Sequence, residues 1–205
     1  SGTVAFSMAG AERMRIDANG NVGIGQAPNM KLNILHADED GIRLNTADGA
    51  ASFIDFGDAS DNDIGRLSYD HADNHMAFRT NNTERIRIDT NGNVGIGNSS
   101  PSSYYSSFDN LVVGSSGANG ITIVSSSNQV GTIGFADGTS GLELYRGFVQ
   151  YNHTADELYL GTLGATQLTI DDDGNVGIGR INPRVPLHVE LATGETAHFG
   201  SHLSI

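Results

Sequence analysis

The chain has 205 residues, a formal net charge of −13, 27 glycines and no cysteine. The lack of cysteine in the sequence excludes disulfides, zinc–thiolate sites and thiol catalysis. The acidic balance argues against nucleic acid as a partner, because phosphate binding needs clustered Lys and Arg. No apolar run approaches the ~18 residues of a membrane-spanning helix, so we expect no membrane insertion.

The first predicted elements form a strand, a turn and a returning strand. Residues 13–17 alternate apolar and polar side chains, which indicates a strand with one buried face. Asn19-Gly20 is a strong hairpin signal. The returning strand is the hexapeptide Gly-Asn-Val-Gly-Ile-Gly at residues 20–25, and a proline follows it. Further short strands are predicted at residues 32–34 and 42–44.

This order of elements recurs twice along the chain. The matching segments are strands 85–89 and 167–171, turns Asn91-Gly92 and Asp173-Gly174, hexapeptides 92–97 and 174–179, and later strands 111–113, 121–123, 187–189 and 197–199. Unequal spacing places insertions in loops, most clearly at residues 99–110. We therefore interpret the chain as a partial first repeat at 1–49, a second at 50–123 and a third at 124–205 that is truncated at its C-terminus.

The hexapeptide places its apolar residues on one face and its glycines on the other. The motif residues are Gly20, Val22, Gly23, Ile24, Gly25, Gly92, Val94, Gly95, Ile96, Gly97, Gly174, Val176, Gly177, Ile178 and Gly179. Glycine normally weakens a strand, so its alternation here predicts a second backbone passing close on that side. A bulge or a bend is the alternative, and recurrence in three copies favours close packing.

The pattern predicts an all-β fold that one chain cannot complete alone. No stretch shows a sustained helical period, so strands and turns are expected throughout. The repeat is longer than a solenoid rung, which argues against a single-chain ladder. The strands are short, and one chain would bury too little apolar area to offset its backbone entropy. We expect several identical chains to wind together, with apolar faces on a common axis and glycines allowing neighbouring backbones to approach.

Residues 78–89 carry a resemblance to a known family. Their sequence, Phe-Arg-Thr-Asn-Asn-Thr-Glu-Arg-Ile-Arg-Ile-Asp, is followed by Thr90-Asn91-Gly92, the hexapeptide and Pro101. This string resembles the repeat of bacteriophage tail fibres and tailspikes, which often lies upstream of an intramolecular chaperone domain. Similar repeats also occur in large bacterial surface proteins. The resemblance covers almost the whole chain.

The resemblance implies a specific assembly and location. The assembly would be an elongated, intertwined homotrimer, a triple-stranded β-helix or β-prism-like shaft built from tandem β-hairpin repeats. Such a chain would be made in the host cytoplasm and would lie in the virion tail. It would attach the virion to a host surface, commonly to carbohydrate.

Several histidines and acidic clusters are candidate metal ligands. His198 and His202 could line a three-fold axis and bind a metal there, and His71 and His75 could share one strand face. Solvated or hydrogen-bonded histidine is the favoured alternative. The clusters at residues 38–40 and 171–173 suggest calcium, but turn formation explains them better because Ala18-Asn19 replaces two of the acids in the first repeat. No cofactor is expected.

Catalysis finds little support in the sequence. A glycosidase needs two carboxylates ~5–10 Å apart, and Asp137, Glu143, Asp156 and Glu157 are the acids least explained by the repeat. Nothing singles out a pair among them. The hexapeptide is no dinucleotide fingerprint, because no predicted helix follows it. We therefore expect a protein that is not an enzyme.

The insertion at residues 99–110 holds the best binding candidates. Tyr104, Tyr105 and Phe108 could stack on sugar rings of a host glycan. A small satellite core under the loop is the alternative. The sequence thus favours a structural phage fibre that presents or contributes to receptor binding. A fragment of a polysaccharide-degrading tailspike and a bacterial surface adhesin repeat stay open as alternatives.

Overall fold

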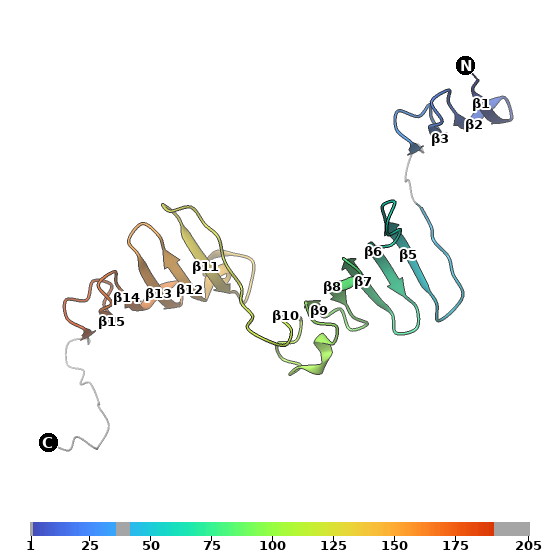
Figure 1. Ribbon diagram of the computed structural model, residues 1–205. Coiled ribbons are helices and arrows are strands. Elements are labelled where there is room, and N and C mark those ends of the chain that lie inside the picture. The colour runs from blue at the N-terminus through green and yellow to red at the C-terminus, as the bar shows by residue number, and fades with distance from the viewer. Residues whose placement is uncertain (1, 36–41, 191–205) are drawn as a thin grey trace. The chain divides into compact units, whose positions relative to one another are not determined.

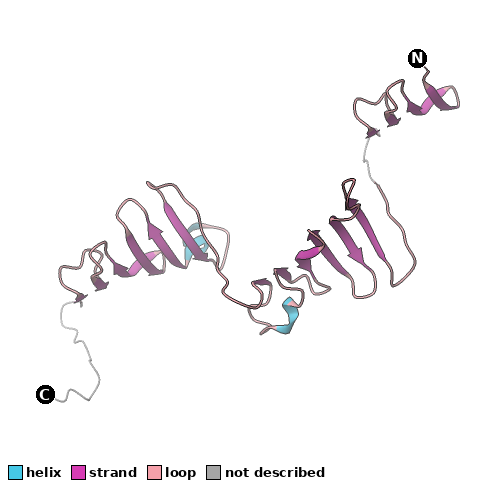
Figure 2. Ribbon diagram, viewed as in Figure 1, coloured by secondary structure: helices cyan, strands magenta, loops and turns pink. Residues whose placement is uncertain are grey.

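The computed structural model describes residues 2–35 and 42–190. Contacts divide the chain into two compact units, Ser1–Asn119 and Gly120–Ile205, which are considered separately. The described residues form strands and turns with two short 3-10 helices, η1 at Pro101–Ser103 and η2 at Gly141–Tyr145, and no α-helix (Figure 2). The all-β prediction is therefore confirmed.

The first unit holds two sheets (Figure 1). The four-stranded sheet has the order β1-β2-β3-β4, with strands Val4–Met8, Ala11–Ile16, Val22–Ile24 and Leu32–Ile34. The six-stranded sheet has the order β10-β9-β8-β7-β6-β5, with β5 Ala51–Phe56, β6 Gly65–Asp70, β7 His75–Thr80, β8 Thr83–Ile88, β9 Val94–Ile96 and β10 Leu111–Val113. The strands of each sheet lie within one predicted repeat.

The second unit holds one six-stranded sheet of the same design. Its order is β11-β12-β13-β14-β15-β16, with strands Val130–Phe135, Gly147–Asn152, Glu157–Thr162, Ala165–Ile170, Val176–Ile178 and Leu187–Val189. In each of the three sheets a tight turn links two long antiparallel strands just before the hexapeptide hairpin. Both central residues of that turn have positive φ, at Ala9-Gly10, Asn81-Asn82 and Leu163-Gly164. This is the type I′ geometry that suits the twist of a two-residue hairpin.

The three predicted hexapeptide hairpins are confirmed. β3, β9 and β15 each pair antiparallel with the strand before them. In the first hairpin the Asp17 carbonyl accepts from Gly20 N at 3.0 Å, and the Asp17 carboxylate accepts from Asn19 N at 2.8 Å and Asn21 N at 2.9 Å. Asp89 and Asp171 organise the other two turns in the same way.

The strand after each hexapeptide runs parallel to it, which the sequence pattern did not predict. β4 pairs with β3, β10 with β9 and β16 with β15, all in parallel. Parallel neighbours usually need a crossover of about a dozen residues or more. In the first repeat only residues 25–31 make this connection. The chain must therefore double back tightly across the hexapeptide strand.

This tight return explains the hexapeptide glycines. A Cβ at the central glycine would lie 2.2 Å from Gln26 O at Gly23, 2.0 Å from Asn98 O at Gly95, and 2.1 Å from Arg180 O at Gly177. The predicted close backbone is confirmed at this position, and within the chain its source is the turn that follows the hexapeptide strand. The backbone belongs to the same chain, three residues further on, and no neighbouring copy is needed to explain it.

The final glycine of each hexapeptide has a second cause. Gly25, Gly97 and Gly179 have φ of +78°, +69° and +69°, a region that side chains with a Cβ rarely adopt. At these positions the alternative of a bend is the correct one. The glycines therefore permit the turn itself, and the expectation that they also line an interface between chains stays a prediction.

Two predicted strands are absent from the described part of the chain. Residues 42–44 and 121–123 have no regular secondary structure, although both precede the first strand of a six-stranded sheet. Alternation of apolar residues marked them as strands, but neither joins a ladder within the chain. The third predicted segment, 197–199, lies outside the described residues.

Candidate self-association surface

One face of the second sheet carries two continuous rows of large side chains. Cross-strand pairing aligns the first row as Ile54, Leu67, Phe78, Ile86, Ile96 and Val113. The second row is Ser52, Tyr69, Met76, Ile88, Val94 and Leu111. Residues in register on neighbouring strands point to the same face, so each row crosses the whole sheet.

The other two sheets repeat this arrangement. In the third sheet the rows are Ile133, Val149, Leu160, Leu168, Ile178 and Val189, and Gly131, Tyr151, Leu158, Ile170, Val176 and Leu187. In the first sheet they are Phe6, Met14, Ile24 and Ile34, and Val4, Ile16, Val22 and Leu32. We call these surfaces the apolar faces. The hexapeptide Val and Ile belong to them in every repeat.

The apolar faces are open to solvent. Phe78 is 40% exposed, Ile96 42% and Leu187 53%, whereas other members of the rows, such as Leu67, Ile86 and Leu168, are half-buried. Among the strand residues that the structure describes, Ala77, on the opposite face, is the one buried hydrophobic side chain apart from glycines. A monomeric soluble protein rarely leaves a contiguous apolar patch of this extent exposed. The sheets therefore lack the packed second layer that a stable fold needs.

An extended segment covers one margin of each large apolar face. Ile121 and Ile123 line a cavity of about 330 Å³ with Ile133 and Val149, and the Ile123 side chain lies 3.5 Å from the Cβ position of Gly131. The absence of a side chain at Gly131, on the edge strand β11, makes room for residues 121–123.

The second sheet has the same feature. Ile42 and Leu44 line a cavity of about 210 Å³ with Ile54 and Met76, and Ser52 Oγ donates to Leu44 O at 3.4 Å. Because the covering segment leaves a cavity behind it, the chain alone fills the apolar face only in part. Further apolar side chains fit this space.

The opposite face of the first and of the second sheet carries charged side chains that form ion pairs. Arg15 contacts Glu12 at 2.7 Å and Arg87 contacts Glu84 at 2.8 Å. The ion pair with Glu12 raises the pKa of Arg15, and the hydrogen bond from Arg15 lowers the pKa of Glu12. Exposed pairs of this kind add little to stability, because solvent screens the two charges. The polar face is thus suited to water, and the apolar face to a partner.

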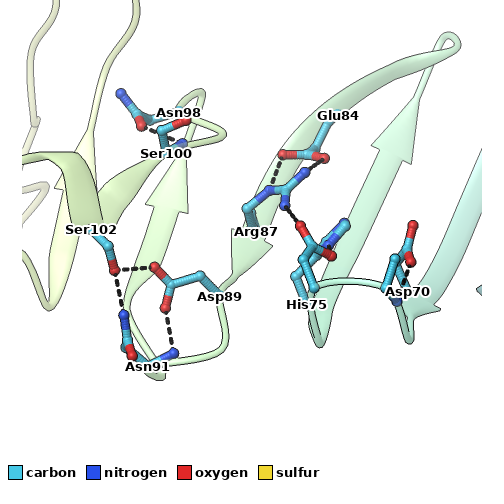
Figure 3. A network of polar contacts seen from close by, with 11 residues as sticks. Asp70, His75, Glu84, Arg87, Asp89, Asn91, Asn98, Ser100 and Ser102 are labelled. Atoms are coloured by element: carbon cyan, nitrogen blue, oxygen red, sulfur yellow. Dashed lines mark hydrogen bonds and ion pairs between the residues drawn. The ribbon is translucent and has the colours of Figure 1, made fainter. Parts of the chain in front are cut away.

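Figure 3 shows the hydrogen-bond network around the second hexapeptide turn. Ser102 Oγ donates to the Asp89 carboxylate at 2.5 Å and accepts from Asn91 Nδ2 at 3.0 Å and Asn93 Nδ2 at 2.9 Å. Partial burial raises the pKa of Asp89, but the hydrogen bonds from Ser102, Asn93 and Asn91 outweigh it and hold that pKa below its ordinary value. The insertion therefore fastens this turn through its serine.

The three aromatic residues of the insertion are exposed. Tyr104 accepts a hydrogen bond from Asn98 Nδ2 at 3.1 Å, and the Tyr105 and Phe108 rings lie 5.2 Å apart. Tyr105 is 67% exposed and Phe108 70%. The alternative of a buried satellite core is therefore wrong for these rings. The structure brings two of the predicted binding residues together as an exposed aromatic pair.

His71 and His75 are the two candidate metal-binding histidines that lie in the described part of the chain. His198 and His202 lie outside the described residues. His71 packs edge-on against Tyr69, whereas His75 pairs with Asp73, so the two histidines serve different contacts. The hydrogen bond from His75 holds the pKa of Asp73 below its ordinary value.

A cluster not predicted from the sequence includes His75. Ligand atoms of Asp70, Asp73 and His75 all lie within 4.8 Å of one another, a donor set that a divalent cation accepts. Arg87 also contacts Asp73 at 3.5 Å and balances its charge (Figure 3). The cluster is thus already satisfied by groups of the chain. At residues 171–173, the turn interpretation is confirmed by the contacts of Asp171; residues 38–40 lie outside the described part.

The four acids considered for catalysis each contact a different group. Asp137 pairs with Arg146 at 3.1 Å, and Glu143 accepts from Ser140 at 3.3 Å. Asp156 accepts a hydrogen bond from the Tyr151 hydroxyl, and this bond raises the pKa of Tyr151. Burial, reinforced by a hydrogen bond to Glu157, raises the pKa of Tyr159. Each of these four carboxylates therefore has a polar partner within the chain.

No protein-family model matches the chain, and a search of curated proteins gives no significant match. Within the described ranges, no helix has the length and apolar character needed to cross a membrane.

Proposed function

We propose that this chain is the repeat region of a structural fibre, a phage tail fibre or tailspike shaft, that assembles from identical copies. The observation that carries the proposal is the exposed apolar face on each described sheet. Burying one aliphatic side chain fully stabilises a protein by about 1.5–3 kcal/mol. The rows place such side chains next to one another, so one partner surface covers many of them at once.

A second copy of the same chain is the partner that fits best. The hexapeptide part of the rows has the same register in all three sheets and the rows are mostly apolar in each, so a copy of the chain offers apolar side chains at matching intervals. Open cavities beside residues 42–44 and 121–123 leave room for side chains from outside. The resemblance to fibre repeats favours three copies, a homotrimeric shaft in the virion tail, over other symmetries.

The mass in solution tests this proposal. Light scattering on the purified chain, or crosslinking followed by mass measurement, should give three copies. A clean monomer at micromolar concentration contradicts the fibre. A stable dimer keeps self-association but rejects the three-fold shaft.

A contribution to glycan binding is a second candidate function. It is favoured by the exposed aromatic pair Tyr105 and Phe108, because aromatic faces stack on sugar rings. A glycan array should identify a ligand that the Tyr105→Ala and Phe108→Ala variants lose, while Leu163→Ala, an equally exposed apolar residue elsewhere, retains it. Binding that survives both aromatic changes rejects this site.

Cleavage of host polysaccharide is the less favoured alternative, and we propose that this region is not an enzyme. Incubation with capsule or lipopolysaccharide, followed by a test for new reducing ends, decides between the two. A bacterial adhesin repeat is distinguished by the neighbouring genes, which would not encode phage structural proteins.

A further inference from the structure

The three hexapeptide turns form a comparison series within one chain. In each, the glycine N–H donates to the carbonyl of the Asp three residues earlier, at 3.0, 2.9 and 3.0 Å for Gly20, Gly92 and Gly174. Each of these glycines has positive φ, and nothing lies within 4 Å of its Cβ position. The backbone geometry is thus shared, and chemical differences between the turns come from side chains.

The first two turns contain an Asn-Gly pair, which carries intrinsic reactivity. The glycine nitrogen can attack the preceding asparagine at Cγ, because glycine has no side chain to obstruct the approach. A bond forms between N and Cγ, the Cγ–Nδ2 bond breaks, and ammonia leaves. Water then opens the resulting succinimide to aspartate or isoaspartate. The reaction consumes one water and releases one ammonia, and it needs no oxidant or enzyme.

Two of the three Asn-Gly pairs of the chain have an anchored side chain. Asn91 Nδ2 donates to Ser102 Oγ at 3.0 Å (Figure 3). Asn119, which precedes Gly120, accepts from Ser115 N at 3.0 Å and donates to Ser115 O at 2.8 Å. Attack on Cγ requires the side chain to rotate and release these bonds. The anchors therefore oppose deamidation at both positions.

Asn19 differs in its surroundings. Its side chain is exposed and has no hydrogen-bond partner among the residues that the structure describes. Its main-chain carbonyl instead accepts from Lys31 Nζ at 2.9 Å. That carbonyl and the Gly20 nitrogen belong to one peptide group. When the nitrogen loses its proton before attack, the negative charge spreads onto the carbonyl oxygen, where the ammonium group stabilises it.

Lys31 is the single lysine of the sequence. Its carbonyl accepts from Val22 N, a place taken by Asn110 in the second repeat and Pro186 in the third. Neither of those residues brings a positive charge. The cationic contact therefore belongs to the first turn alone.

We propose that Asn19 is a self-deamidation site of this protein, that Lys31 promotes the reaction, and that Ser102 protects the equivalent Asn91. The aspartate product places Asp-Gly in the first turn, as Asp173-Gly174 does in the third. The isoaspartate product adds a backbone atom to the turn and disrupts the hydrogen bonds that Asp17 receives from it. The proposal is independent of self-association.

Peptide mapping by mass spectrometry over a time course at mildly alkaline pH tests the proposal on the full chain. Asn19 should convert about tenfold faster than Asn91 or Asn119, as expected where anchoring costs a hydrogen bond. In the urea-unfolded chain, where both the anchors and the lysine contact are lost, the three rates should become similar. Equal rates in the folded chain, or the same ranking in urea, overturn the proposal.

Two variants separate the roles. Lys31→Gln should slow conversion of Asn19 by about two- to fivefold, the range of an exposed charge contact, and leave Asn91 unchanged. Ser102→Ala should raise the rate at Asn91 and leave Asn19 unchanged. An unaltered Asn19 rate in Lys31→Gln rejects the role of the lysine. If Ser102→Ala fails to fold, the comparison of folded and urea-unfolded parent protein still decides protection at Asn91.

Discussion

The central glycine of each hexapeptide is required by the turn that follows it. The sequence predicts that a small residue is needed at Gly23, Gly95 and Gly177, because strands otherwise avoid glycine. It does not predict which atom comes close. A neighbouring chain and the chain's own turn exclude a Cβ equally, so only coordinates identify Asn98 O and its counterparts as the cause.

Replacing Gly177 by alanine should therefore destabilise the fold. The new Cβ would lie 2.1 Å from Arg180 O, and relief of such overlap costs about 1–3 kcal/mol. Gly134→Ala makes the same chemical change in the same sheet, where nothing lies within 4 Å. Denaturant unfolding should show a lower midpoint for Gly177→Ala than for Gly134→Ala. Equal midpoints would mean that the turn shifts freely and that the glycine has another cause.

The carboxylate of Asp89 gives the second turn a dependence on pH. Its pKa is lowered in the folded state, so its contribution to stability is present above the unfolded pKa of about 3.9 and is lost as pH falls through the lower folded value. Asp89→Asn cannot accept the Ser102 hydrogen bond at its amide nitrogen and should be less stable than the parent at pH 7. The gap should narrow below about pH 4. A gap that is constant with pH contradicts the role of the charge.

At the scale of elements, local signals were predictable and strand direction was not. Asn19-Gly20 and its counterparts encode a tight turn in their own chemistry, so the hairpins were predicted correctly. Parallel pairing of β4, β10 and β16 was missed because alternation specifies a face but not a direction. The turn at Leu163-Gly164 was not predicted either, because leucine rarely adopts a positive φ such as the +54° of Leu163.

The candidate surface was predictable only in part. Alternation identified Val22, Ile24 and their counterparts as one apolar face. The extent of the rows depends on register across six strands, including a bulge at Phe78/Arg79 that recurs in the other two sheets. Register of this kind is set by turn geometry, and the sequence alone left it open.

A charge placed on the apolar face should disrupt assembly without disrupting the sheet. Ile133 and Thr132 are neighbours on β11, both exposed, and face opposite sides. Ile133→Glu should reduce the mass in solution, because burying an unpaired carboxylate at an interface is costly. Thr132→Glu adds the same charge on the polar face and should keep the parent mass. Equal masses for both variants would reject the apolar face as the interface, provided circular dichroism shows intact sheets.

At the scale of the whole molecule, stability should depend on concentration. A sheet with one open face has few contacts within its own chain to stabilise it, so under the fibre proposal we expect the free energy of unfolding to include the free energy of association. The fibre proposal further predicts resistance to proteases and detergent, because unfolding one copy requires separating it from the others.

The unfolding temperature provides the test at this scale. It should rise as the protein is concentrated, measured by calorimetry across a dilution series. Ile133→Glu should weaken this dependence, and Thr132→Glu should not. A temperature that stays constant across dilution in the parent would show that one chain is stable alone.

If copies of the chain associate, the similarity of the apolar rows allows them to pair in more than one register. A copy displaced lengthwise by one repeat meets Leu160 and Leu168 where Phe78 and Ile86 belong, a mismatch of few atoms. In such a staggered assembly the terminal repeats would have no partner, but most of the apolar side chains would still be buried. The register between copies must then be set by a feature that differs between the repeats. The loop that carries Tyr105 and Phe108 occurs in one repeat and is the natural candidate.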